Sequence, residues 1–108
     1  MNALDVVVAQ LAAFNAHDLD AFVATYAPEA VVSGVLAEPI AGREALIEFY
    51  RPRFENPELS CEIETVVQFG QRWVVAREYV SNGDVSTETI ATFDVVDDLI
   101  QRASMLKA

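Results

Sequence analysis

The sequence contains one cysteine, Cys61, and one histidine, His17, among its 108 residues. A single cysteine excludes an internal disulfide bond, and without further cysteines or histidines a transition-metal site is not expected. We interpret His17 as an exposed turn residue between two predicted helices, and Cys61 as an inert buried thiol. The apolar core must then stabilise the domain, and we expect no metal and no other cofactor.

Basic residues are scarce, because 7 lysines and arginines stand against 17 acidic residues, and the formal net charge is −10. This charge repels phosphate backbones and anionic lipid surfaces, so neither nucleic acid nor a membrane is an expected partner. No run approaches the roughly 18 apolar residues that a membrane span needs. The first residues, Met1–Asp5, lack the basic start of a secretion signal, and we expect a cytoplasmic protein.

Glycine and proline are few, with 4 of each, whereas 53% of the residues are hydrophobic. At this length, folding removes roughly two-thirds of the unfolded chain's surface from water, which is enough for a core without covalent links. We therefore expect one globular domain over residues 1–108.

The first half of the chain predicts three helices. Asn2 can cap the first helix, with Asp5 placed to bond back to the capping residue. The buried face of this helix would carry Leu4, Val7, Val8, Leu11 and Phe14. Asp18 can cap a second helix that Pro28 ends, and a third helix from Arg43 should kink or end at Pro52.

The second half of the chain shows a hydrophobic period of two, which is typical of strands. After a short strand at Ala30–Ser33, the predicted strands are Leu59–Phe69, Arg72–Val80, Val85–Val96 and Leu99–Leu106. Two-residue turns would lie between them at Gly70-Gln71, Asn82-Gly83 and Asp97-Asp98. The pattern predicts an α+β domain in which three helices pack on a curved antiparallel sheet.

Those turns set a register that places Glu64, Arg77 and Glu88 side by side on the outer face of the sheet. The same face carries Trp73 and Tyr79. Trp, Tyr and Arg are enriched at protein interfaces, so we expect a homodimer formed through this outer face.

The inner face is apolar apart from one charge, and it should face the helices. It would carry Ile63, Thr65, Val67, Val74, Ala76, Glu78, Thr87, Thr89, Ala91 and Phe93. Glu78 would lie between Ile63 and Thr87, where burial raises the pKa of a carboxyl group and suits it to proton transfer. The alternative is a glutamate near the open end of the domain that reaches water or a helix-borne arginine such as Arg51 or Arg53.

Four segments resemble the nuclear transport factor 2-like superfamily, and within it the SnoaL-like branch of polyketide cyclases, ketosteroid isomerases and small bacterial steroid delta-isomerase-like proteins. They are residues 14–22 (FNAHDLDAF), 26–32 (YAPEAVV), 41–46 (AGREAL) and 93–100 (FDVVDDLI). The resemblance spans residues 4–106. It implies a cystatin-like cone with a pocket between helices and sheet, and a homodimer through the outer sheet face.

The resemblance also indicates where isomerase catalytic residues would lie. Those enzymes use a carboxylate base, a tyrosine and a protonated carboxylic acid, and the three positions fall on Gly34, near Gln10 and on Thr89. The carboxylate of related epoxide hydrolases falls on Met105. None of these residues can perform the corresponding role, so neither mechanism is predicted.

We therefore predict a protein that binds a small apolar, carbonyl-bearing molecule in the pocket. If it is an enzyme, the chemistry would be cofactor-free proton transfer, as in isomerisation, cyclisation or dehydration, with Glu78 as the candidate catalytic residue. The candidate ligand-binding residues are Phe14, Tyr26, Tyr50, Phe54, Ile63, Thr87 and Thr89. The alternatives are a non-catalytic binding or dimerisation module of the same fold, with the aromatic residues as ordinary core.

Overall fold

The computed structural model describes residues 1–107 and shows three helices on one six-stranded sheet. The helices are α1 (Ala3–Asn15), α2 (Leu19–Ala24) and α3 (Arg43–Phe54). The strands are β1 (Tyr26–Ser33), β2 (Ile40–Ala41), β3 (Ser60–Phe69), β4 (Trp73–Ser81), β5 (Ser86–Val96) and β6 (Leu99–Lys107). The predicted α+β fold class is confirmed. Within residues 1–107, no helix is long and apolar enough to cross a membrane.

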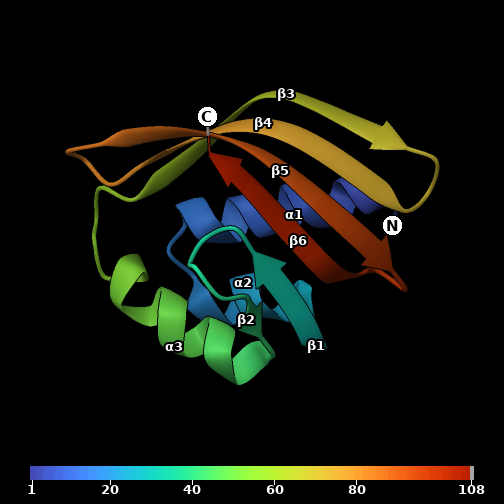
Figure 1. The fold of residues 1–108 in the computed structure, drawn as a ribbon, viewed down its shortest axis with the longest axis horizontal. Helices are drawn as coiled ribbons and strands as arrows, with labels where there is room; N and C mark the ends of the chain where they lie inside the picture. Colours follow the sequence, from blue (N-terminus) through green and yellow to red (C-terminus); the bar gives the residue numbers. More distant parts are fainter. Residues whose placement is uncertain (108) are drawn as a thin grey trace.

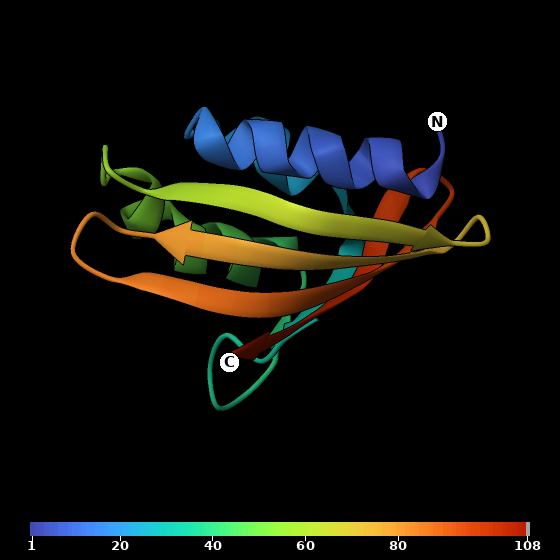
Figure 2. The same ribbon diagram turned by 90° about the horizontal axis from the view of Figure 1, so that it is seen from above.

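The sheet has the strand order β2-β1-β6-β5-β4-β3 (Figure 1). Strands β3 to β6 form the predicted antiparallel meander, whereas β1 pairs in parallel with β6, so the complete sheet is mixed. All three helices lie on one side of the sheet in Figure 1, and α1 runs alongside β3 in Figure 2. The curved sheet and the helix layer together form a cone.

Helix α1 begins as the sequence predicts, because Asn2 and Asp5 form a capping box with distances of 2.8 and 3.1 Å. Its buried face differs from the prediction, and consists of Ala3, Val6, Val7, Gln10, Ala13 and Phe14. Val8 is 51% exposed. The helix is apolar over much of its circumference, so the spacing of hydrophobic residues alone could not select the face that packs on the sheet.

Neither Pro28 nor Pro52 ends a helix. Helix α2 ends at Ala24, and Pro28 lies within β1. There the pairing of β1 with β6 is irregular between Tyr26 and Val31, so the missing amide of proline is tolerated. Helix α3 continues past Pro52 to Phe54, although Pro52 lacks the amide that would bond to the carbonyl four residues back.

Two of the three predicted turns are longer than two residues. Phe69 pairs with Trp73, and Ser81 pairs with Ser86, whereas the two-residue turn at Asp97-Asp98 is confirmed. A bulge in β3 between Ile63 and Thr65 compensates for the longer first turn. The prediction that Thr65 and Val67 lie on the inner face of the sheet is therefore wrong, and both side chains are exposed.

The register around Glu78 is partly as predicted. Ile63 lies opposite Glu78, as the sequence indicated. The partner on β5 is Thr89, and Thr87 lies opposite Val80. The four-residue loop between β4 and β5 shifts β5 by two positions, which keeps the same face inward but moves Thr89 into the place expected for Thr87.

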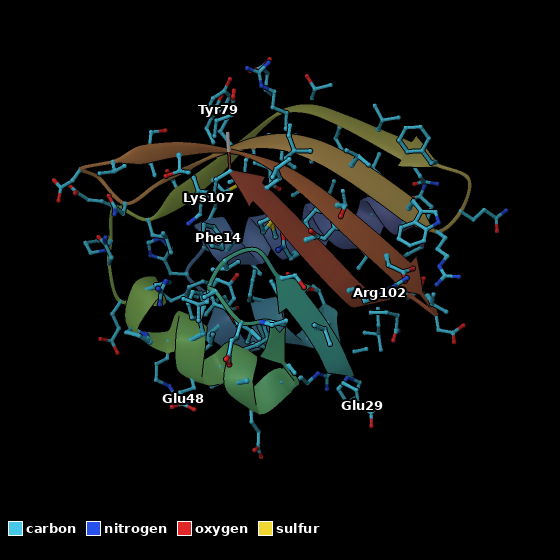
Figure 3. All side chains as sticks on the ribbon, in the orientation of Figure 1. Phe14, Glu29, Glu48, Tyr79, Arg102 and Lys107 are labelled. Carbon is cyan, nitrogen blue, oxygen red and sulfur yellow. The ribbon has the colours of Figure 1, made fainter. Side chains whose placement is uncertain are left out.

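The outer face carries the predicted cluster of Glu64, Arg77 and Glu88, but the predicted register is wrong there, because Arg77 lies opposite Thr65 and Ile90 and reaches both glutamates diagonally. Arg77 forms ion pairs with Glu64 at 3.2 Å and with Glu88 at 2.7 Å, and the Tyr79 hydroxyl donates a hydrogen bond to Glu64 at 2.7 Å. Figure 3 shows Tyr79 pointing away from the helices. These pairs are partly exposed, so their contribution to stability is small.

A second ion cluster lies where β4, β5 and β6 meet. Asp94 is only 2% exposed and accepts hydrogen bonds from Arg72 at 2.5 Å and from Arg102 at 2.9 Å. These two guanidinium groups, Arg72 first, lower the pKa of Asp94 below its ordinary value of 3.8. The cluster joins β5 and β6 to the turn that precedes β4, and it stabilises the ionised form of the Asp94 carboxyl group.

Asp94→Asn is expected to reduce the free energy of unfolding at pH 7 by about 2 kcal/mol, because the bonds to two arginines lose their charged acceptor. Because the pKa of Asp94 is lower in the folded than in the unfolded protein, its ionised carboxylate stabilises the fold at pH values above 3.8. The difference in stability between the parent and the variant should therefore shrink as the pH falls through 3.8 and below. Urea unfolding at several pH values measures this. Asp97→Asn, the same charge change at an exposed turn residue, serves as the control and should be nearly neutral.

Candidate functional site

The helix layer is joined by a cluster of aromatic rings around Phe22, which is 1% exposed. Its ring centroid lies 4.8 Å from Tyr50, 5.2 Å from Phe54, 5.4 Å from Tyr26 and 5.9 Å from Phe14. These rings come from α1, β1 and α3, while Phe22 lies on α2. Tilted and edge-to-face pairs of this kind are favourable, so the cluster fixes the helices relative to one another.

A cavity of about 620 Å³ lies between this aromatic layer and the sheet. Its buried lining residues are Gln10, Phe14, Phe22, Tyr50, Leu59, Cys61, Glu78 and Thr89. Its exposed lining residues, which we call the rim, are Pro52, Arg53, Asn82, Val85 and Lys107. The remaining lining residues are half-buried: Leu11, Val35, Phe49, Asn56, Val80, Thr87 and Met105. The volume and the mainly apolar wall are typical of a small-molecule site.

Glu78 is the single acidic residue among those that line the cavity, and it is 5% exposed. Burial raises its pKa from 4.5 to about 7, while a hydrogen bond from the Cys61 thiol acts in the opposite direction. Burial and the nearby Glu78 raise the pKa of Cys61 to about 12, so this thiol stays protonated at neutral pH. Among residues 1–107, no arginine or lysine forms an ion pair with Glu78.

Thr89 lies directly across the strand pair from Glu78 and is 6% exposed. Within residues 1–107, its Oγ1 is the one buried side-chain oxygen or nitrogen without a hydrogen-bond partner. An unsatisfied buried hydroxyl is destabilising, and this one belongs to a residue of the cavity wall. Two facing residues of the cavity wall thus combine an unpaired buried hydroxyl group with a carboxyl group that can gain or lose a proton near pH 7.

The structure places four of the seven predicted ligand-binding residues in the cavity wall: Phe14, Tyr50, Thr87 and Thr89. Burial raises the pKa of Tyr50 to about 12, so its phenol stays protonated. Tyr26, Phe54 and Ile63 do not line the cavity. Tyr26 lies behind the wall, where its hydroxyl accepts a hydrogen bond from Gln10 at 3.1 Å and burial raises its pKa. Phe54 belongs to the aromatic cluster.

Several cavity residues were not among the predicted ligand-binding residues, among them Gln10, Arg53, Met105 and Lys107. Gln10 and Met105 carried a usable signal, because the family resemblance maps catalytic positions near the first and onto the second. Lys107 gave none, since the inward direction of its side chain depends on the pairing of β6 with β5.

Gly34 occupies the position where the family resemblance places the isomerase base. Its φ is +88°, which side chains rarely adopt, and an added Cβ would clash with the backbone carbonyl oxygen of Met105. This position therefore cannot carry a carboxylate without displacement of β6. The geometry excludes the isomerase arrangement at this point and leaves Glu78 on β4 as the acid of the cavity.

A curved sheet and a helix layer that enclose an apolar cavity define a cystatin-like domain of the nuclear transport factor 2-like class. The chain belongs to the SnoaL-like domain family, whose model matches residues 7–103. No protein among those with curated functions matches the chain significantly.

Solved structures of similar proteins show the same fold. An uncharacterised cystatin-fold protein from Novosphingobium aromaticivorans has a TM-score of 0.88 and 24% identity, with 98% of each chain covered. A protein from Sinorhizobium meliloti, assigned provisionally as a polyketide cyclase, has a TM-score of 0.77 and 21% identity, with 94% of each chain covered. One from Kribbella flavida, assigned provisionally as a ketosteroid isomerase, has a TM-score of 0.82 and 18% identity, covering 96% of this chain and 76% of that one.

Glu78→Gln is expected to stabilise the protein relative to the parent by about 3 kcal/mol at pH 8 and by less than about 1 kcal/mol at pH 5. Because the folded-state pKa is raised to about 7, the parent loses stability as the pH rises from 4.5 through 7, and the amide does not titrate. Urea unfolding of both proteins at pH 5, 6, 7 and 8 gives the difference. Equal stability at every pH would contradict the raised pKa.

Proposed function

We propose that this protein binds a small apolar, carbonyl-bearing molecule in the cavity and that Glu78 transfers a proton to or from it. The observation that carries the proposal is the pair formed by the buried Glu78 carboxyl and the unpartnered Thr89 hydroxyl in an apolar wall. Two of the similar structures carry provisional names of an isomerase and a cyclase. The class of reaction proposed is isomerisation or cyclisation through an enol.

The chemistry follows from the two groups. The ionised Glu78 carboxylate removes a proton from the carbon next to the carbonyl. The electron pair of that C–H bond forms the C=C bond of the enolate, and the π pair of the C=O bond moves to the oxygen. The Thr89 hydroxyl donates a hydrogen bond to this oxygen, which stabilises the developing negative charge. A carboxyl group with a pKa of about 7 is partly ionised at neutral pH and can return the proton to another atom.

The alternative is a binding module without catalysis. The binding module is favoured because this chain lacks the isomerase catalytic groups at the positions that the family resemblance indicates. Gly34 stands where the base would lie and cannot carry a carboxylate, and Thr89 stands where the acid would lie. A single neutral hydroxyl is a weaker stabiliser of an enolate than a tyrosine with a protonated acid. The two functions share the cavity and differ in whether proton exchange occurs in it.

Deuterium exchange into 2-acetonaphthone, an apolar aromatic methyl ketone, separates them. In D₂O buffer at pH 7, the parent should accelerate the loss of the methyl proton signal at least about tenfold over buffer. This threshold is modest, because general-base catalysis typically contributes about a hundredfold or more. Glu78→Gln should bind the ketone and lose the acceleration, because the amide cannot accept the proton. Glu62→Gln, at an exposed residue on β3, should behave as the parent.

The outcomes of this experiment differ between the two functions. Binding of the ketone without accelerated exchange would contradict catalysis and support the binding module. A parallel NMR titration of the Glu78 carboxyl carbon should give a midpoint near pH 7. A midpoint near pH 4.3, as in a free glutamate, would contradict both the raised pKa and the proton-transfer proposal.

The outer sheet face is proposed as the surface of a homodimer. Val67, Phe69 and Trp73 are 45%, 56% and 41% exposed, next to the Arg77 ion pairs. Apolar and aromatic side chains beside arginine are characteristic of interface cores. Their exposure on a single protomer favours a second copy as the partner.

Light scattering after gel filtration at physiological ionic strength should give about twice the protomer mass of 11.9 kDa. Val67→Glu should shift the protein to a monomer, since it introduces an unpaired charge into the proposed interface. Val8→Glu changes an exposed valine on α1 and should leave the dimer intact. A monomeric parent at micromolar concentration would contradict the dimer.

A further inference from the structure

The charged residues of the cavity are distributed unevenly between its interior and its rim. Glu78 lies in the interior, whereas Arg53 and Lys107 lie on the rim, and no acidic residue belongs to the rim. Glu58 and Asp84 occur in neighbouring loops but do not line the cavity. Acidic residues outnumber basic ones 17 to 7 in this chain, so an opening with two cations differs in sign from the rest of the protein.

Arg53 is oriented by its contacts with Phe49, a residue of the cavity wall. Its guanidinium carbon lies 3.6 Å from the centroid of the Phe49 ring, and Nη1 donates a hydrogen bond to the Phe49 carbonyl oxygen at 2.9 Å. Within residues 1–107, Nε and Nη2 form no hydrogen bond. The guanidinium group is therefore held at the opening with donors available to an anion.

Lys107 belongs to a row of facing residues on three neighbouring strands. Glu78 on β4 pairs with Thr89 on β5, and Thr89 pairs with Lys107 on β6. Residues paired in this way have side chains on the same face of the sheet, and all three line the cavity. Figure 3 shows Lys107 at the end of β6, with Phe14 behind it on α1. The row therefore leads from the buried carboxyl group past the unpartnered hydroxyl to a cation at the rim.

From this arrangement we infer that the ligand is an apolar molecule with one anionic group, which Arg53 and Lys107 bind at the rim while the apolar body fills the interior. The inference rests on the proposed binding function of the cavity and adds the charge and orientation of the ligand. With its anion at the rim, the molecule extends past Thr89 toward Glu78. A neutral ligand of the same shape would leave the two rim cations unused.

Two fluorescent probes with the same aromatic skeleton test the inference, 8-anilinonaphthalene-1-sulfonate as the anion and N-phenyl-1-naphthylamine as its neutral counterpart. Both should bind the parent and displace each other, because both would occupy the one cavity. The anionic probe should bind about fivefold more tightly, as expected for exposed charge pairs. Added salt should reduce this difference.

Arg53→Gln combined with Lys107→Gln should weaken binding of the anionic probe about fivefold and leave the neutral probe unchanged. Arg51→Gln is the matched control, because Arg51 is an exposed arginine of the same helix that does not line the cavity. It removes one positive charge from the protein, so it reports any effect of net charge alone. Circular dichroism and thermal unfolding verify that all variants fold.

The outcomes distinguish failure of the inferred ligand charge from failure of the proposed function. If the neutral probe binds and the anionic probe binds no better, the inferred ligand charge is wrong and the proposed binding function stands. The same conclusion follows if Arg51→Gln weakens the anionic probe as much as the rim variant does. If neither probe binds, the cavity is not a site for apolar ligands, and the proposed function fails together with the inference.

Discussion

The contact on which the rest of this structure depends is the burial of Phe22 among four other aromatic rings. Helix α2 has six residues, and a helix of that length is not stable in water by itself. Phe22 stabilises it by joining α1, α3 and β1 into one layer. This layer covers the curved sheet without filling it, and the space left between them is the cavity. Packing of the helices and the existence of a site are thus consequences of the same cluster.

Two buried carboxylates show how one sheet can contain both a structural and a chemical acid. Asp94 is 2% exposed and Glu78 is 5% exposed, so both lose most of their hydration. Asp94 regains favourable interactions from Arg72 and Arg102, and its pKa falls. Within residues 1–107, Glu78 forms no ion pair with a cation, and burial raises its pKa to about 7. The difference lies in the partners rather than in burial, because desolvation by itself opposes the charge on both.

Much of the fold could be predicted from local sequence signals. The capping residues Asn2 and Asp18 begin α1 and α2, and the change of hydrophobic period marks the strands. The glutamate at position 78 could also be identified, because it is the single charge on an apolar strand face. Its cross-strand partner Thr89 was predicted to lie two positions away, with Thr87 opposite Glu78, and Lys107 was not predicted as a cavity residue. The position of Thr89 depends on the length of the loop between β4 and β5, and that of Lys107 on the register shift between Asp94 and Val95. Neither the loop length nor the shift is fully determined by the residues at those places.

The sequence by itself determined the α+β class, the helices, the meander and the face on which Glu78 lies, because these follow from hydrophobic spacing, caps and turn residues acting over a few positions. Only the tertiary structure decided the register, the bulge near Ile63, the parallel pairing of β1 with β6 and the set of residues around the cavity. These features minimise exposed apolar surface and unpaired backbone groups over the whole chain at once. A cavity is the volume that such packing leaves unfilled, so no local pattern of residues specifies it.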